Sequence, residues 1–329
     1  MIDLVISGPD MSGTGTQVND LINFFISQGK KVRDIRGTEI DALFHAQIFE
    51  NLNENYLNLK DFLENSSDDY LKKEFIYQAH KLLTGGGTNQ DLKISSCIKN
   101  DVSTYIDPDS ADVWIMEEPT KRGAGQVNRT IEQQRTRYND KLNATAAALC
   151  HQTYRTDEFL RFRKILRENN KIIIRSRSEE SACYQIFDKD FISNGISREE
   201  YINLPGHKIA FGNPPTHIFI VCASPDWSRE EFLSLKKERS YGRLIDDHEI
   251  NVDYQLCVNR RYSTDWFEGL YKEACEKYNS KLPDIAKFYM YDSKEEIKNK
   301  MEEKIKSILK YEYFSPADNF GAYAGQSAS

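Results

Sequence analysis

Two glycines near the amino terminus stand where a phosphate-binding turn is expected. A short apolar run, Ile2 to Ile6, leads into GPDMSGTGTQ, which holds Gly8 and Gly13, and an amphipathic helical pattern follows from Val18. Strand, glycine turn and helix form the context that such a turn requires. Its backbone N–H groups and the positive end of the helix dipole would attract phosphate oxygens, and glycine permits close approach of the backbone.

The spacing of these glycines matches the Walker A pattern, but the two residues after Gly13 differ from it. Thr14 and Gly15 occupy the positions of the lysine and of the Mg²⁺-binding hydroxyl. The expected turn therefore keeps its backbone donors and lacks the usual point charge. Thr14 and Thr16 are the hydroxyls nearest to the expected Mg²⁺ position. The alternative is an ordinary glycine turn between a strand and a helix.

Basic side chains after two expected strands could cover phosphates in place of the missing lysine. Arg175 and Arg177 follow the apolar run 172–174, and Lys121 and Arg122 follow the strand expected at 112–116. Phosphoryl transfer depends chiefly on in-line positioning and positive charge. Arginine suits this task because it binds phosphate with two parallel hydrogen bonds. Solvated surface charge is the alternative for each of the four.

Strands that alternate with helices indicate an α/β fold with a parallel sheet and helices on both faces. Ligands of such sheets bind beyond the carboxyl ends of the strands. The expected strands lie at 2–6, near 32, and at 112–116, 172–174, 217–223 and 287–291. The expected helices lie at about 127–151, 156–169, 229–237, 265–277 and 294–310, with a charged polar stretch at 238–259.

One long insertion interrupts the α/β pattern, and the pattern ends before the last residues of the sequence. We expect one α/β domain formed by residues 1–35 and 111–314. The stretch 36–110, rich in Asn, Asp and aromatic residues, is expected to be a mainly helical insertion. Its triple glycine, 85–87, follows no strand and is interpreted as a hinge or turn. Residues 315–329 have the composition of a flexible tail.

Composition narrows the class of protein. The chain has 329 residues, 39% of them hydrophobic, which is enough for a normal core, and its net charge of -7 argues against general nucleic-acid binding. The six cysteines form no C-x-x-C pair and are expected to be free thiols of a reducing compartment. Because no stretch approaches about 20 apolar residues and no signal peptide is visible, we expect a cytoplasmic protein without a membrane span.

Four segments, taken in chain order, resemble the thymidylate kinases, a family of P-loop nucleoside monophosphate kinases. Each segment is similar to a motif of that family, with key residues in register. The resemblance covers roughly residues 1–35 and 111–310, and the insertion has no counterpart in compact members of the family. The four segments are the turn at 8–17, Glu118 to Arg129, Ala147 to Arg155, and Ile172 to Gln185.

The resemblance implies a P-loop NTPase-type three-layer fold. It also implies transfer of the γ-phosphate of ATP, with Mg²⁺, to a (deoxy)pyrimidine monophosphate or a modified form of one. By the same resemblance Asp10 would lie near the sugar 3′-hydroxyl and Arg155 near the acceptor phosphate. Tyr184 and Gln185 would lie against the base, and Glu118 would orient the loop or a metal-bound water. The plain alternatives are a turn former for Asp10, a helix-terminal cation for Arg155 and a core edge for Tyr184.

Further residues are assigned by the same resemblance. The segment 236–243 lies where the family has a mobile lid, so Arg239 and Arg243 could close over the donor phosphates; a solvated helix end is the alternative. Arg129 would contact the substrate. The ATP-binding set is Gly8, Ser12, Gly13, Thr14, Gly15, Thr16, Gln17, Arg239 and Arg243. The catalytic set is Arg155, Arg177, Arg175, Asp10 and Glu118.

Departures from the family pattern keep a second hypothesis open. Besides the altered turn, Glu117 replaces an arginine, and the aspartate expected near Arg175 is missing. Archaeal-type cytidylate kinases look like kinases whose own turn has threonine at the lysine position, so this change alone does not exclude phosphoryl transfer. The alternatives are an inactive kinase-fold protein that binds nucleotide as a sensor or scaffold, and a kinase whose acceptor is not a free nucleotide. A homodimer stays open, because the insertion could supply a dimer surface, an acceptor pocket or a partner site.

Overall fold

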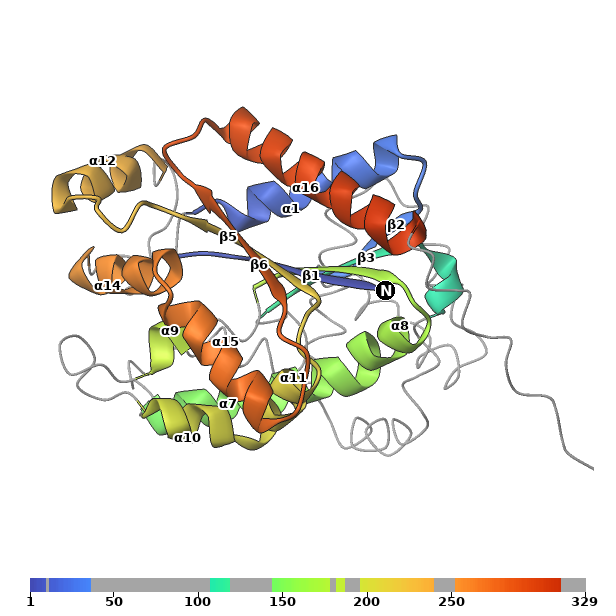
Figure 1. Cartoon of the computed structure of the whole chain (residues 1–329), viewed down its shortest axis with the longest axis horizontal. Coiled ribbons are helices and arrows are strands. Elements are labelled where there is room, and N and C mark those ends of the chain that lie inside the picture. The colour runs from blue at the N-terminus through green and yellow to red at the C-terminus, as the bar shows by residue number, and fades with distance from the viewer. Residues whose placement is uncertain are drawn as a thin grey trace, which may run out of the picture.

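The protein has a six-stranded sheet in which every strand is parallel to its neighbours, as the computed structural model in Figure 1 shows. The strand order is β2-β3-β4-β1-β5-β6, which places the amino-terminal strand in the middle. The strands are β1 (Ile2–Ser7), β2 (Val32–Asp34), β3 (Val113–Glu117), β4 (Ile172–Ser176), β5 (His217–Cys222) and β6 (Asp284–Tyr289). The structure describes residues 1–9, 12–36, 107–118, 144–177, 182–186, 196–239 and 252–314.

Helices cover both faces of the sheet, so the expected α/β architecture with a parallel sheet is confirmed. In Figure 1, α1 and α16 lie above the sheet, and α7, α10, α11 and α15 lie below it. The longer helices are α1 (Thr14–Ser27), α7 (Ala144–Glu158), α11 (Pro205–Gly212), α12 (Arg229–Arg239), α14 (Val252–Ser263), α15 (Trp266–Lys277) and α16 (Lys294–Phe314). The shorter ones are the 3₁₀ helix η2 (Pro108–Ser110), the π-helical η3 (Phe159–Arg163), α8 (Lys164–Glu168), α9 (Ala182–Gln185) and α10 (Arg198–Asn203).

The alternation of side chains along β1 explains why both faces need cover. Ile2, Leu4 and Ile6 belong to the core cluster that also contains residues of α1 and α16. Val5 belongs to the cluster on the opposite face, with residues of α14 and α15. Successive residues of a strand point to opposite faces, so a central strand must be apolar on both.

The connections place β1 at a topological switch point. From β1 the chain runs through α1 to β2 at one edge, whereas from β4 it crosses β1 and reaches β5 on the other side. In open parallel sheets, ligands bind at the carboxyl ends of the strands around such a point. The turn after Ser7 lies at this position.

Three expectations differ from the structure in detail. One continuous helical run covers 144–168 where two helices were expected to meet near 152–155, because no proline or glycine interrupts it. The polar stretch at 238–259 contains the start of α14, which begins at Val252. Strand β6 begins at Asp284, earlier than expected. Nearly all of the expected insertion, residues 37–106, and the expected tail, 315–329, lie outside the described residues.

Candidate functional site

The turn between β1 and α1 requires glycine at two positions. A Cβ atom on Gly8 would lie 2.1 Å from the carbonyl oxygen of Val221 and 2.5 Å from the Ser12 hydroxyl oxygen. Gly13 is the N-cap of α1 and has φ 85°, a left-handed conformation that side chains disfavour. Gly8 therefore allows the end of β1 to pack against the end of β5, and Gly13 allows the chain to enter the helix.

The first turn of α1 has backbone N–H groups for which the described part of the chain supplies no acceptor. The Ser12 N–H donates to the Pro9 carbonyl (3.1 Å), and the Gln17 N–H donates to the Gly13 carbonyl (3.0 Å). Among the described residues, none accepts a hydrogen bond from the N–H groups of 13–16. Such groups at a helix amino terminus attract anions.

Two buried side-chain oxygens in the same turn also have no hydrogen-bond partner in the described part of the chain. They are the Ser12 Oγ and the Gln17 Oε1, and each of these residues is only 3% exposed. Thr14 is largely buried on the same side of α1, whereas Thr16 is exposed. Buried polar atoms without partners are rare in native proteins, and each calls for an explanation such as a bound ligand.

The carboxyl ends of four strands meet around this turn. Register pairs Ile6 of β1 with Ser176 of β4, and Ser176 with Glu117 of β3. The Glu118 N–H donates to the Ser176 carbonyl, and the Arg177 N–H donates to the Ile6 carbonyl, both at 2.9 Å. Glu118 and Arg177 thus lie at the same edge of the sheet as the glycine turn.

Arg177, predicted as a catalytic residue, and Tyr184, predicted to lie against the base, are brought together near the end of β4. Arg177 places its guanidinium carbon 6.0 Å from the centre of the Tyr184 ring, and the Tyr184 carbonyl accepts a hydrogen bond from the Tyr254 hydroxyl at 2.7 Å. Arg177 has φ 68°, which is unusual for a large side chain and costs about 1–3 kcal/mol. Strain of this kind concentrates at functional sites.

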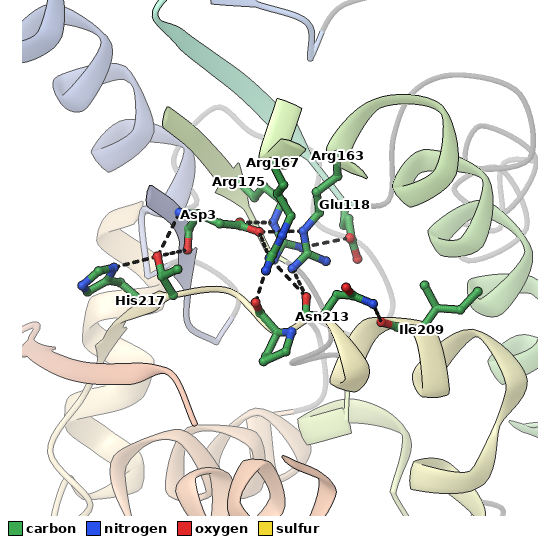
Figure 2. A network of polar contacts seen from close by, with 10 residues as sticks. Asp3, Glu118, Arg163, Arg167, Arg175, Ile209, Asn213 and His217 are labelled. Atoms are coloured by element: carbon green, nitrogen blue, oxygen red, sulfur yellow. Dashed lines mark hydrogen bonds and ion pairs between the residues drawn. The ribbon is translucent and has the colours of Figure 1, made fainter. Parts of the chain in front are cut away.

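A second polar centre is buried between the sheet and the helical run 144–168. Asp3 of β1 is fully buried and accepts hydrogen bonds from the Arg163 Nε (2.7 Å), the Arg167 Nη1 (2.8 Å) and the Arg175 Nε (3.1 Å). Figure 2 shows these arginines converging on Asp3, with Arg163 and Arg167 also donating to the Asn213 carbonyl. The carboxylate therefore ties β1, β4 and the helical run together.

The surrounding arginines decide the ionisation of Asp3. Burial alone would raise the pKa of this carboxyl, but the positive charges of Arg163, Arg175 and Arg167 outweigh burial and hold the pKa well below 3.8. Asp3 is therefore ionised in the folded protein at neutral pH. The ion pairs of Asp3 stabilise the fold at any pH above the pKa that this carboxyl has in the unfolded chain. The stabilisation is lost as the pH falls below that value.

Two arginines predicted to contact phosphate have carboxylates as partners instead. Glu118 accepts hydrogen bonds from the Arg155 Nε (3.0 Å) and from the Arg175 Nη1 (3.4 Å). Both arginines are buried, with 4% and 1% of their surface exposed. The adjacent cavity, also lined by Arg163, has a volume of about 10 Å³, which is room for about one water molecule. In this arrangement the guanidinium groups of Arg155 and Arg175 bind the Glu118 carboxylate.

His207 of α11 extends the buried centre. Its Nδ1 is 2.6 Å from the Tyr201 carbonyl oxygen and must donate a proton to it. The Nε2 then accepts hydrogen bonds from the Arg155 Nη1 (2.8 Å) and the Gln152 Nε2 (2.9 Å). The Arg155 guanidinium can only donate, so the Nε2 of His207 accepts from it and the Nδ1 donates to the Tyr201 carbonyl.

The π-helical segment η3 sets the rotation of the helical run. Two turns of an α-helix take about 7.2 residues, and a π turn adds about one. Arg155 and Arg163 are eight residues apart with η3 between them, so both face the sheet. In an uninterrupted α-helix, the second arginine would be rotated away from Asp3.

Sequence reasoning missed Asp3, Arg163, Arg167 and His207. A charged residue inside the apolar run MIDLVIS was the available signal for Asp3, since a buried carboxylate needs cations. Nothing in the sequence separates Arg163 and Arg167 from ordinary solvated helix charges. Of the residues named in advance, Asp10, Lys121, Arg122, Arg129 and Arg243, and the side chains of Gln185 and Arg239, lie outside the described residues.

Comparison with known proteins found no family model that matches the chain and no matching curated protein. Among the described residues, no helix has the length and apolar character needed to cross a membrane. The same residues contain no group of three or more His, Cys, Asp or Glu side chains placed to hold a metal ion. Any functional assignment therefore depends on the glycine turn and the strand ends around it.

We expect Gly8→Ala to destabilise the protein by about 1–3 kcal/mol or more, because the new Cβ would overlap the Val221 carbonyl. Gly15→Ala is the matched control, since a Cβ there meets nothing within 4 Å and alanine favours a helix by up to about 1 kcal/mol. Urea denaturation of both variants measures the difference. Equal stability of the two would show that the ends of β1 and β5 are not packed as described.

We expect Asp3→Asn to lower the free energy of unfolding by about 3–5 kcal/mol at pH 7, because three arginines lose their buried carboxylate. Asp157→Asn removes a half-exposed partner of Arg161 and should cost no more than about 0.5 kcal/mol. Because the pKa of Asp3 is lowered, the difference in unfolding free energy between wild type and Asp3→Asn should shrink as the pH falls below 3.8. A gap independent of pH, measured by urea denaturation across the acid range, would contradict the charge argument.

Proposed function

We propose that the chain is a nucleotide-binding phosphotransferase of the nucleoside monophosphate kinase kind, with a P-loop-type three-layer fold. Its reaction would be transfer of the γ-phosphate of ATP to a (deoxy)pyrimidine monophosphate or a modified form of one. The observation that carries the proposal is the turn after the central strand, where four N–H groups lack acceptors among the described residues. A polyphosphate is the ligand whose chemistry matches those donors.

Residues at neighbouring strand ends supply further parts of such a site. Arg177 follows the strand next to β1, and its backbone N–H bonds to the Ile6 carbonyl, so its charge is available at the edge of the sheet where the turn lies. Tyr184, which lies against Arg177, offers an aromatic face of the kind on which a base can stack. Glu118 is held in place by two arginines, so its carboxylate is oriented before any ligand arrives. These placements support binding of a phosphate and a base at one edge of the sheet.

The first turn of α1 also carries side-chain oxygens of the kind that a divalent cation binds. The Gln17 Oε1 is a buried oxygen without a partner in the described part of the chain, and the Thr14 hydroxyl lies on the same side of α1. Hard cations such as Mg²⁺ prefer oxygen ligands of this kind. When bound, Mg²⁺ would supply positive charge to the phosphates. The protein's part is to position the phosphates with its amides and to add the charge of Arg177.

A second candidate function is nucleotide binding without turnover, as in a sensor or scaffold. The observation that favours it is the pairing of Arg155 and Arg175 with Glu118 and Asp3, which engages two cations expected near the phosphates. The lysine of the turn is replaced by Thr14 as well. Both candidates need the turn to bind nucleotide, and they differ in whether phosphate is transferred.

A transfer assay separates the two candidates. Incubated with labelled ATP, Mg²⁺ and a panel of pyrimidine monophosphates, the wild type should label at least one acceptor. Arg177→Ala should lower the rate about 100-fold, because a charge beside the transferring group is removed. Arg161→Ala, which removes a half-exposed arginine paired with Asp157, is the control and should leave the rate unchanged.

Binding must be followed in parallel by thermal shift. Stabilisation by nucleotide without transfer to any acceptor would support the second candidate over the first. No stabilisation and no transfer would overturn both. Loss of transfer in Arg161→Ala as well as Arg177→Ala would point to general instability and remove the support drawn from Arg177.

A further inference from the structure

Helix α9, which carries Tyr184, is only one turn long. The Ile186 N–H donates to the Ala182 carbonyl at 3.1 Å and closes that turn. The last carbonyls of a helix have no N–H group of the same helix to bind. The carbonyls that follow Ala182 therefore depend on donors from other parts of the chain.

Helix α14 supplies those donors, and Figure 1 shows it next to α9. The Arg261 Nη1 donates to the carbonyls of Cys183 and Ile186, both at 3.0 Å. The Tyr254 hydroxyl donates to the Tyr184 carbonyl at 2.7 Å. Two side chains of α14 thus bind three backbone carbonyls in and just after α9, and they hold this short helix in place.

The same helix is bonded to the strand ends beside the glycine turn. The Ala223 N–H, directly after β5, donates to the Asn259 Oδ1 at 2.9 Å. The hydroxyls of Ser7, the last residue of β1, and Tyr262 are hydrogen-bonded at 3.1 Å. Helix α14 therefore joins the phosphate side of the proposed site to the segment that carries Tyr184.

Tyr254 contacts Tyr184 in two ways. Its hydroxyl binds the Tyr184 carbonyl, and the centres of the two rings are 6.1 Å apart with the planes tilted by 58°. The Arg177 guanidinium also lies near the Tyr184 ring, which is only half-buried. The backbone and the ring of Tyr184 are thus both placed by Tyr254, and part of the Tyr184 side chain stays open to a ligand.

We propose that Tyr254 is a positioning residue that places Tyr184 against the nucleobase of the acceptor. This inference rests on the proposed function and adds a residue that decides affinity for the acceptor without touching it. The apparent affinity of a site falls with the fraction of molecules in which the site is formed. Loss of the Tyr254 hydroxyl lowers that fraction at Tyr184, whereas the bonds of α14 to Ala223 and Ser7 stay as they are.

Calorimetry of the full chain with thymidine monophosphate, cytidine monophosphate and ATP tests the inference. Tyr254→Phe keeps the ring and removes the hydroxyl that binds the Tyr184 carbonyl. It should bind the preferred monophosphate about 5-fold more weakly than the wild type does, which corresponds to one neutral hydrogen bond. Its affinity for ATP should be that of the wild type. If Tyr254→Phe does not fold, Tyr254→Met replaces it and should show the same selective loss.

Tyr278→Phe is the matched control. The Tyr278 hydroxyl also donates to a backbone carbonyl, that of Ile202, at 2.7 Å and in a part-buried position. Tyr278 ends α15 and lies shortly before β6 begins, at the edge of the sheet opposite to the glycine turn. Both variants should lower the midpoint of thermal unfolding to a similar extent, but only Tyr254→Phe should bind the monophosphate more weakly.

A double variant tests whether Tyr254 acts through Tyr184. Tyr184→Leu removes the aromatic face and keeps the backbone carbonyl that Tyr254 binds. When Tyr254→Phe is added to Tyr184→Leu, the affinity for the monophosphate should fall no further, because the side chain being positioned is already gone. An additive loss would show that Tyr254 does not act through Tyr184 and would overturn the inference.

The remaining outcomes separate this inference from the proposed function. Unchanged monophosphate affinity in Tyr254→Phe, or an equal loss in Tyr278→Phe, would overturn the inference while nucleotide binding stands. Binding of ATP without binding of either monophosphate by the wild type would also overturn it and leave the glycine turn as a nucleotide site. No binding of any of the three probes by the wild type would overturn both proposals.

Discussion

The ionised carboxylate of Asp3 is the constraint on which much of the architecture depends. A buried charge is tolerated only when it is paired and hydrogen-bonded, and Asp3 meets this condition with three arginines from β4 and the helical run 144–168. The two carboxylate oxygens of Asp3 thereby fix the position of β4 and the rotation of the helical run. Through Arg163 they also fix the path of the loop at Asn213. Replacing a single member leaves the others charged and buried, so the cluster acts as a unit.

The same cluster shapes the edge at which the glycine turn lies. Arg175 contacts both Asp3 and Glu118, so the charge deep in the sheet is connected to the carboxylate that follows β3. Glu118 is in turn held by Arg155, which His207 orients. Pre-oriented groups at the ends of rigid strands are what a binding site needs. The largely apolar interior of the sheet and its polar edge are therefore parts of one arrangement.

Features that depend on a local sequence pattern were predictable, whereas side-chain contacts between distant segments were not. Strands β1, β4 and β5 were predictable because each is a short apolar run bounded by turn residues, and the turn from Gly8 was visible from its spacing. Helix α14 was hidden because its buried face carries the polar residues Gln255, Asn259 and Arg261. Asn259 and Arg261 bond to backbone groups of other segments. The π turn and the arginines around Asp3 have no local signature. Their burial is decided by strands more than a hundred residues away.

The central place of β1 has a consequence for the order in which the chain folds. Asp3 pairs with Arg163, which follows it by 160 residues, and its carbonyl accepts a hydrogen bond from Thr216, which follows it by 213. During synthesis the apolar strand β1 stays unpaired until its partner strands β4 and β5 have been made. Non-local pairings of this kind slow folding and leave strand edges open to aggregation. Both edges of β1 are covered only by strands that follow it at long range, so its hydrogen-bonding groups stay open until β4 and β5 are available.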